Sequence, residues 1–583
     1  MDQRFDPILV EVIKNELAAV TEEMAIAVSK TARSAMVKIG DFAATICDGQ
    51  GRLIGPGYAA PFQLAIFLEV MAGVIRKWHG TFRPKDVLVV NDPYAGMGHM
   101  PDVAIITPVF WHQHLVAFTL AYSHHTDAGG RFAGGFSSQC TESFEEGLRL
   151  PAVKLYTEGR RNDALLDMIL ANVRTPEEWL GDVEAKVVGC WRGAQELRRP
   201  LDKYGLDTFT SCCEHLMDHA EQATRAAIQA IPDGRYEQED LFEDDGFGNA
   251  VALPLKVALH VVGDTLTADF AGTAPQAPGA INMPHSMTKA MVYGALKLMV
   301  SPDILLNSGF VRPVQVAIPH GSLLNPRYPA AVGGRASLAF RVSDMVFRAL
   351  AKALPDKVPI VGEGGDVLHF VGRKADGQSF AAMDGFFGGW GARPDKDGID
   401  GVTPMTFGSY GTTPAELLER EYPLVVDGFG YVPDSGGPGK YRGSVSVYRQ
   451  WRFLQPGTIM VRTNRPARPC EGLAGGQPGA LSQNVLNPET DAVPLPRQTH
   501  LHFEVKPGDR VFHAISGSGG YGDPWEREPA QVQKDVQDGK VTVAGARQQY
   551  GVVINPHSLT IDWEHTQRLR QSREPKASQV AIS

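Results

Sequence analysis

Two polar motifs stand beside apolar runs in the first quarter of the chain. In NDPYAGMGHMPDVAIITPVF (residues 91–110), His99 and Asp102 lie three positions apart, directly before an apolar run. In AYSHHTDAGG (residues 121–130), His124 follows another apolar run. Imidazole and carboxylate groups hold zinc or manganese in catalytic sites. The motifs therefore indicate a divalent-metal site, although polar groups that cap strand ends give the same pattern.

These side chains meet only if the segments that carry them are neighbouring strands. Residues 86–94, 103–110 and 114–122 have the composition of three strands, and the middle one is almost entirely apolar, as in a strand buried on both faces. We expect the strand that ends near His124 to pair with the strand that begins after Asp102. The two motifs would then meet at one edge of a sheet.

Further polar residues could complete such a site. Asp41, in GDFAAT, precedes another predicted strand and is a possible fourth ligand, although an Asp in a turn is the commoner case. His125 and Asp127 could orient the ligands or move protons. Glu142, in TESFEEGLRLP, could act as a general base, and a solvated acidic turn explains it equally well.

Other catalytic signatures are weak. The sequence contains no GxxxxGK[ST] motif, and the glycine-rich segments SGGPGKYRG, GGWGAR and SGSGGYG are better explained as tight turns. ATP therefore has no evident binding motif in this chain. Four arginines in Gly- or Pro-flanked loops could hold a carboxylate or phosphate, or could simply bridge loops: Arg312, Arg335, Arg393 and Arg442.

Composition places the chain among ordinary globular proteins. It has 583 residues, 43% hydrophobic and 21% charged, with a net charge of -10. The acidic balance argues against a nucleic-acid partner. We find no secretory signal and no apolar run of ~18 residues that would span a membrane, and we expect a cytoplasmic protein. The six scattered cysteines predict reduced, mostly buried thiols.

Periodicity predicts a mixed α+β fold with several layers. Helices are expected near residues 7–34, 60–78, 162–230, 286–300 and 338–354, and short strands in the glycine-rich segment 362–520. We expect a strand–turn–strand unit at residues 42–55 and a hairpin about Gly263. We divide the chain into an N-terminal metal-site α/β domain (1–233), a mixed, β-rich domain (234–525) and a C-terminal segment of two short helices and a frayed tail (526–583).

Several long motifs, in order, resemble the hydantoinase B family. They include KDVLVVNDPYAGMGHMPDVAIITPVF, SHHTDAGG, GTAPQAPGAINMPHSMTKAMVYGALK, NPRYPAAVGGR and YVPDSGGPGKYRGSVSVYR, and the resemblance extends from about residue 6 to residue 555. The family includes small subunits of ATP-dependent hydantoinases, 5-oxoprolinases and caprolactamase. Subunits of acetone and acetophenone carboxylases are more distant relatives.

The resemblance implies a metal site made by Asp41, His99, Asp102 and His124, with zinc the expected ion and manganese the alternative. It also implies a larger hydantoinase A-type partner that binds ATP, in a heterotetramer or larger assembly, and bicarbonate as a possible co-substrate. One departure concerns the substrate pocket: many relatives have HLGAM where this chain has FQLAI, so Gln63 stands where His is expected. Many also have GGTH in place of GMGH.

These observations predict ATP-dependent opening of a cyclic amide, in which the partner activates the substrate and the metal site of this chain activates water. Three alternatives remain at this stage. The chain could belong to a ketone carboxylase, could be a non-catalytic scaffold whose metal is structural, or could be a metalloamidase that acts without ATP.

Overall fold

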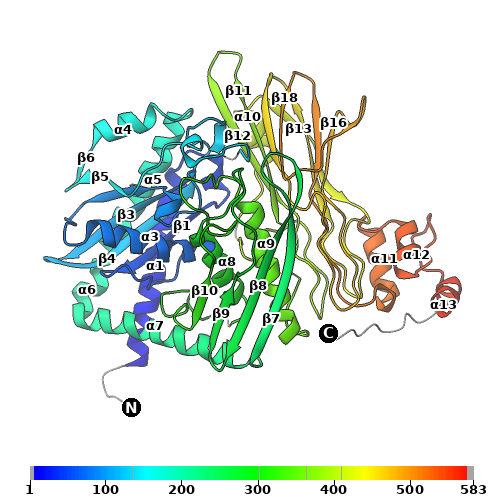
Figure 1. Cartoon of the computed structure of the whole chain (residues 1–583), viewed down its shortest axis with the longest axis horizontal. Helices are drawn as coiled ribbons and strands as arrows, with labels where there is room; N and C mark the ends of the chain where they lie inside the picture. Colours follow the sequence, from blue (N-terminus) through cyan, green and yellow to red (C-terminus); the bar gives the residue numbers. More distant parts are fainter. Residues whose placement is uncertain are drawn as a thin grey trace.

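The structure, a computed structural model, describes residues 6–135, 137–300, 303–360, 362, 364–408 and 410–573. Within these ranges the strands of this mixed fold lie in four sheets (Figure 1). In these ranges the paired strands are antiparallel, except β9 and β10, which run parallel. The predicted α+β class is therefore confirmed.

The N-terminal sheet has the order β1-β4-β3-β2-β5-β6. Its strands are β1 (Phe42–Asp48), β2 (Val87–Val90), β3 (Asp102–Trp111), β4 (His114–His124), β5 (Val153–Thr157) and β6 (Arg160–Arg161). The three strands predicted between residues 86 and 122 are present. The turn expected after β1 brings residues 52–55 back beside it, where the Ile54 amide donates to the Ile46 carbonyl oxygen at 3.2 Å and Leu53 bridges Cys47, but these residues form no strand.

Helices cover both faces of this sheet. They are α1 (Pro7–Thr31), α2 (Ala35–Lys38), α3 (Pro61–Trp78), α4 (Asp163–Leu170), α5 (Pro176–Glu196), α6 (Arg198–Tyr204) and α7 (Leu206–Gln229). Phe42, Ala44 and Ile46 of β1 pack with α1, α5 and α7, whereas Ala43 and Cys47 pack with α3 on the other face. Burial on both faces explains why β3 is almost continuously apolar.

The second sheet, of order β10-β9-β8-β7, adjoins α8 (His285–Lys297) and α9 (Ala336–Ala353). Its strands are β7 (Gly234–Asp244), β8 (Ala250–Val262), β9 (Thr265–Asp269) and β10 (Val314–Ala317). The expected hairpin is β8–β9. The sequence did not indicate β7, a half-exposed edge strand rich in charged residues.

Two further sheets pack face to face through a shared apolar core that includes Leu368, Trp451 and Val511. One has the order β12-β11-β15-β18 and the other β13-β14-β19-β16-β17. The strands are β11 (Gly365–Arg373), β12 (Ser379–Phe387), β13 (Leu424–Val432), β14 (Ser446–Phe453), β15 (Gly457–Arg462), β16 (Gln483–Leu486), β17 (Val493–Pro494), β18 (His500–Val505) and β19 (Arg510–Ala514), with α10 (Ala415–Glu421) beside β13.

The C-terminal helices α11 (Pro529–Gln537), α12 (Val543–Tyr550) and α13 (Trp563–Gln571) project from one end of the molecule (Figure 1). The first two were predicted and α13 was not. The tail expected to fray, from Pro575, lies outside the described residues. Four short 3-10 helices complete the described elements: η1 (Pro93–Ala95), η2 (Ala133–Gly135), η3 (Ser143–Glu145) and η4 (Pro524–Glu526).

The largest apolar core joins the first two predicted domains. It contains side chains of the N-terminal sheet, such as Ile106, together with Leu259 of β8 and Phe347 of α9. A boundary at residue 233 therefore does not separate two independent cores, and the three-domain division stays a prediction. All six cysteines are buried and unpaired with one another. Within the described residues, no helix is both long and apolar enough to cross a membrane.

Candidate metal centre

Three strand ends bring the predicted ligands to one edge of the N-terminal sheet. Asp102, the first residue of β3, pairs directly with His124, the last residue of β4. On the other side of β4, Phe42 pairs with Ser123, and the His124 amide donates to the Asp41 carbonyl oxygen at 3.3 Å. The predicted pairing of the strand after Asp102 with the strand ending at His124 is therefore confirmed.

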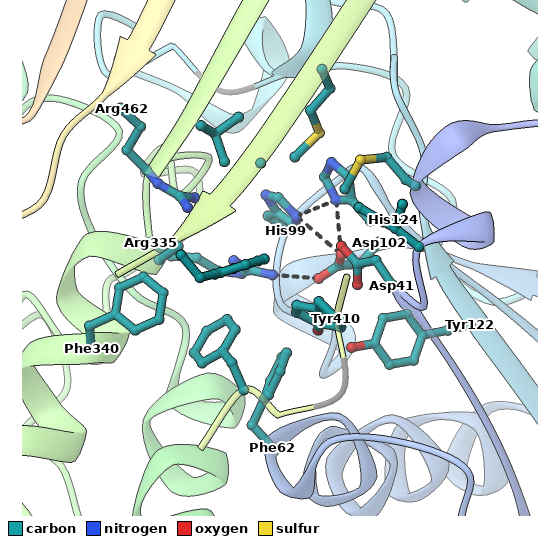
Figure 2. A pocket seen from close by; sticks show the side chains of 18 residues that line it. Asp41, Phe62, His99, Asp102, Tyr122, His124, Arg335, Phe340, Tyr410 and Arg462 are labelled. Carbon is teal, nitrogen blue, oxygen red and sulfur yellow. Dashed lines mark hydrogen bonds and ion pairs between the residues drawn. The ribbon is translucent and has the colours of Figure 1, made fainter. Parts of the chain in front are cut away.

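The His99, Asp102 and His124 side chains converge on one another (Figure 2). His99 Nε2 lies 3.1 Å from Asp102 Oδ1 and 3.2 Å from His124 Nδ1, and His124 Nδ1 lies 3.3 Å from the same Asp102 oxygen. All three residues are buried. Bonds of about 2.0–2.2 Å to a tetrahedral zinc place ligand atoms roughly 3.3–3.6 Å apart, so this donor set fits a divalent cation.

The loop that carries His99 is fixed by its own polar residues. Asn91 Nδ2 donates to the carbonyl oxygens of Met100 and Leu148, each at 2.9 Å, and Asp92 caps η1. Gly96, with φ of 111°, passes so close to α3 that a β-carbon there would lie 2.6 Å from the Val70 nitrogen. The NDPYAGMGH segment thus shapes the loop that places His99 over the strand edge.

Arg335, at the start of α9, holds the second oxygen of the Asp102 carboxylate. Its Nη2 donates to Asp102 Oδ2 at 2.6 Å. A β-carbon on Gly98 would lie 2.7 Å from both Arg335 Nε and that oxygen, so glycine is needed for the approach. Arg335 is one of the four loop arginines that, from the sequence, could hold a carboxylate or phosphate. At this site it does hold a carboxylate, which is the Asp102 side chain of the protein itself.

The electrostatic environment favours the protonation states of metal ligands. Burial and the positive charge of Arg335 lower the pKa of His99 to about 3, so the ring is neutral at pH 7. Burial alone would raise the pKa of Asp102, but the His99 ring and Arg335 hold it well below its usual range. A neutral imidazole and an ionised carboxylate are the forms that bind a cation.

Asp41 lines the same cavity but stands outside the triangle of converging atoms. Gln63 Nε2 donates to Asp41 Oδ1 at 3.3 Å and to the Tyr410 hydroxyl at 2.7 Å. Burial raises the pKa of Asp41 to about 6. Gln63, the departure noted in the sequence, is thus a direct partner of Asp41.

The cavity beside these residues is small and mainly apolar, with a volume of ≈ 60 Å³. Its wall includes Phe62, Phe340 and Phe407, and the Phe407 ring centroid lies 4.2 Å from that of Phe62 and 4.5 Å from that of Phe340. Arg462 and Tyr122 add polar groups at its edge (Figure 2). The aromatic wall comes from segments far apart in the chain, and no local motif indicated it.

His125 points away from this cavity. Its Nε2 lies 2.7 Å from Lys186 Nζ, and its ring packs against Trp179 of α5. Lys186, completely buried, also donates to the Val103 carbonyl oxygen at 2.9 Å and to Ser123 Oγ at 2.8 Å. The lysine therefore fixes the positions next to Asp102 and His124 in both strands, a role that the sequence did not indicate.

Asp127 and Glu142 also lie outside the cavity lining. Asp127 accepts hydrogen bonds from the amides of Gly129 and Gly134, each at 3.0 Å, and pairs with Arg174 at 3.1 Å. Glu142 is exposed and makes a backbone bridge to Ala330. Their contacts support a role for Asp127 in shaping its loop, and the catalytic roles given to His125, Asp127 and Glu142 stay predictions.

Comparison with known protein families shows where the chain belongs. The profile of the family described as Hydantoinase B/oxoprolinase matches residues 6–524. The chain belongs to this family.

Similarity to individual members extends over nearly the whole chain. It is 31% identical to the B-type chain of the putative D-/L-hydantoinase of Pseudomonas sp. (strain NS671), covering 98% of each chain. It is 30% identical to the beta chain of the caprolactamase of Pseudomonas jessenii, covering 94% of this chain and 96% of that one. The crystal structure of the ATP-dependent caprolactamase from that organism superposes with a TM-score of 0.89 at 27% identity, covering 98% of this chain and 100% of the other.

Proposed function

We propose that this chain is the metal-carrying subunit of an ATP-dependent enzyme that opens cyclic amides. The observation that carries the proposal is the convergence of His99, Asp102 and His124 at 3.1–3.3 Å in a buried cavity. Similarity along the full chain to one subunit of a putative hydantoinase and one subunit of a caprolactamase supports the reaction class.

The proposed ligands are His99, Asp102 and His124, with Asp41 as a fourth, and zinc or manganese is the proposed ion. When bound, such a cation supplies Lewis acidity, which acidifies water and polarises a carbonyl oxygen. Arg335 orients the Asp102 carboxylate, and Gln63 and Tyr410 orient that of Asp41. The aromatic wall excludes bulk water and strengthens these electrostatic interactions.

We propose that ATP acts on a larger, hydantoinase A-type partner, in a heterotetramer or larger assembly and with bicarbonate as a possible co-substrate. Both bacterial relatives are named as one subunit of an enzyme, which supports a partner. The 5-oxoprolinase 1 of Arabidopsis thaliana also supports a partner. This chain is 27% identical to it and covers 42% of its length, so the plant protein carries a further large region.

We propose a cyclic amide with an apolar ring as the substrate, because the wall beside the candidate ligands is mainly aromatic. Phe62, Phe340 and Phe407 form the wall that a saturated or aryl-substituted ring would contact. Gln63 places an uncharged amide beside Asp41 and Tyr410 at the edge of this wall. A buried polar group in the substrate would need a partner that this wall does not supply.

The test is to purify the chain with its large partner and to follow, by chromatography, the ring-opened products of caprolactam, an aryl-substituted hydantoin and 5-oxoproline, with and without ATP. The proposal predicts ATP-dependent opening, with the first two favoured over 5-oxoproline. Amide hydrolysis by the isolated chain without ATP would instead establish a stand-alone metalloamidase.

One alternative retains ATP but changes the second substrate. The acetone carboxylase structure superposes with a TM-score of 0.86 at 19% identity, which establishes a shared fold only. Labelled bicarbonate separates the reactions, because a ketone carboxylase retains the label in its product and a ring-opening hydrolase does not. A non-catalytic scaffold would instead hold a structural metal in a closed four-ligand site without a bound water.

A further inference from the structure

A second cavity, of ≈ 350 Å³, lies beside the metal centre and is lined by arginines from three separate segments. Arg131 belongs to the loop after β4, Arg174 to the turn before α5, and Arg373 ends β11. No carboxylate side chain lines this cavity among the residues that the structure describes. We call it the arginine cleft.

The floor of the arginine cleft is the same sheet face that borders the metal cavity. Val367 pairs with Arg462, and both line the metal cavity. Two positions further along the same strands, His369 pairs with Met460, which in turn pairs with His502, and all three line the cleft. Because residues two apart share a face of a strand, the two cavities are consecutive on one surface.

The loop over the cleft is built to a fixed shape. Asp127 accepts hydrogen bonds from Gly129 and Gly134, and a β-carbon on Gly134 would lie 2.5 Å from His369 Nδ1. Asp127 of the HHTDAGG motif therefore holds the Gly134 backbone against His369, and Arg131 lies between Asp127 and Gly134 in this loop. This packing accounts for Gly134, which the metal site does not explain.

The arginines keep hydrogen-bonding capacity. In the described part of the chain, Arg131 donates from its side chain to Glu145, Arg174 to Asp127 and the Gly130 carbonyl oxygen, and Arg373 to the Gly377 carbonyl oxygen. A guanidinium has five N–H donors, so one or two acceptors fix its orientation and leave the others for a ligand.

From this arrangement we propose that the arginine cleft is a binding site for a small oxyanion, of the carboxylate or phosphate class, next to the metal cavity. Charge-assisted hydrogen bonds from planar guanidinium groups suit both kinds of anion. The hydroxyl groups of Ser137, Ser379 and Thr458 line the cleft and offer further polar contacts. The inference goes beyond the proposed function and is tested by binding rather than by turnover.

The experiment is calorimetric titration of the purified full-length chain, with any partner it retains, using inorganic phosphate, acetate and bicarbonate at constant ionic strength. The double variant Arg131→Gln/Arg373→Gln removes two charges from the cleft, and Arg235→Gln removes an exposed charge on β7 as the matched control. We expect at least one anion to bind, with affinity reduced about tenfold or more in the double variant only.

The relative affinities for the three anions identify the kind of chemical group that the arginine cleft binds. Preference for phosphate would assign the site to a phosphoryl group, and preference for acetate or bicarbonate to a carboxylate. Binding that is equal in the double variant and in Arg235→Gln, or no binding of any of the three anions to the unsubstituted chain, would overturn the inference. Melting temperatures in anion-free buffer report folding, and the two single substitutions replace the double variant if it does not fold.

Discussion

Asp102 and His124 face each other across β3 and β4, and their ligand atoms, Oδ1 and Nδ1, lie 3.3 Å apart. The register of one pair of strands thus fixes two of the candidate ligands, and a short loop adds His99. Since a shift of one residue would turn one of these side chains to the opposite face, the site depends on strand register as much as on residue type.

The Gly98→Ala substitution tests the contact between Arg335 and Asp102. The added β-carbon would lie 2.7 Å from Arg335 Nε and Asp102 Oδ2, so the buried ion pair must open. Removing one partner of a buried ion pair costs about 3–5 kcal/mol of stability. Because both partners remain in Gly98→Ala, we expect a smaller loss of stability, about 1–3 kcal/mol, together with the loss of most of the activity. Urea unfolding and turnover measure the two effects.

Gly55→Ala is the matched control for this prediction. Its added β-carbon would lie 3.5 Å from the Ile46 side chain, an ordinary van der Waals distance. If Gly98→Ala is as stable and as active as Gly55→Ala, the contact does not matter for the site.

Lys186→Met tests whether the buried lysine positions the ligands. It would leave the Val103 carbonyl oxygen, Ser123 Oγ and His125 Nε2 without their buried donor. We expect stability to fall by about 2 kcal/mol or more and metal affinity to fall by about tenfold, because each partner adjoins Asp102 or His124. Competition with a chromophoric chelator measures the affinity.

The control is Lys30→Met, which changes an exposed lysine at the end of α1. Metal affinity that is the same in both variants would show that Lys186 stabilises the fold without acting on the site.

Glu146 should make stability depend on pH. Burial raises the pKa of this carboxyl to about 8, even though the amides of Val332 and Gly333 donate to its Oε1. The folded state then favours the neutral acid. Its contribution to stability is fully present below the unfolded pKa of 4.5 and is lost as pH rises through about 8.

Glu146→Gln keeps a neutral acceptor at every pH and should flatten this dependence. The variant is expected to exceed the unsubstituted protein in stability by at least about 1 kcal/mol above pH 8, and to match it near pH 5. Denaturant unfolding across this range is the measurement, with the exposed Glu142→Gln as control. Parallel curves for the two proteins would contradict the assignment.

The strands and the convergence of the candidate ligands were predictable from local sequence because the signals are local. Apolar runs with polar ends marked β3 and β4, and His99-x-x-Asp102 and His124 stood at those ends. Arg335 lies 233 positions from Asp102, and nothing in its own segment says which carboxylate it meets. The same holds for Tyr410 and for the aromatic wall, which packing of distant segments creates.

Half-exposed elements were also hard to predict. In β7 the charged residues of an edge strand hide the alternation that marks a buried strand, and α13 is a short helix with a single buried residue, Thr566. The sequence also placed His125 beside His124, but His125 follows the last residue of β4 in an extended segment, where neighbouring side chains face opposite sides, so His125 meets Lys186 instead.

The most direct test of the account is the metal content of the purified complex, measured by mass spectrometry for the unsubstituted chain, His124→Ala and His114→Ala. His114 is exposed at the opposite end of the same strand, β4, and controls for loss of a histidine. We predict about one zinc or manganese ion per chain in the unsubstituted protein and in His114→Ala, and loss of the ion in His124→Ala. Equal metal content in all three proteins, or none in any, would contradict a metal centre at His99, Asp102 and His124.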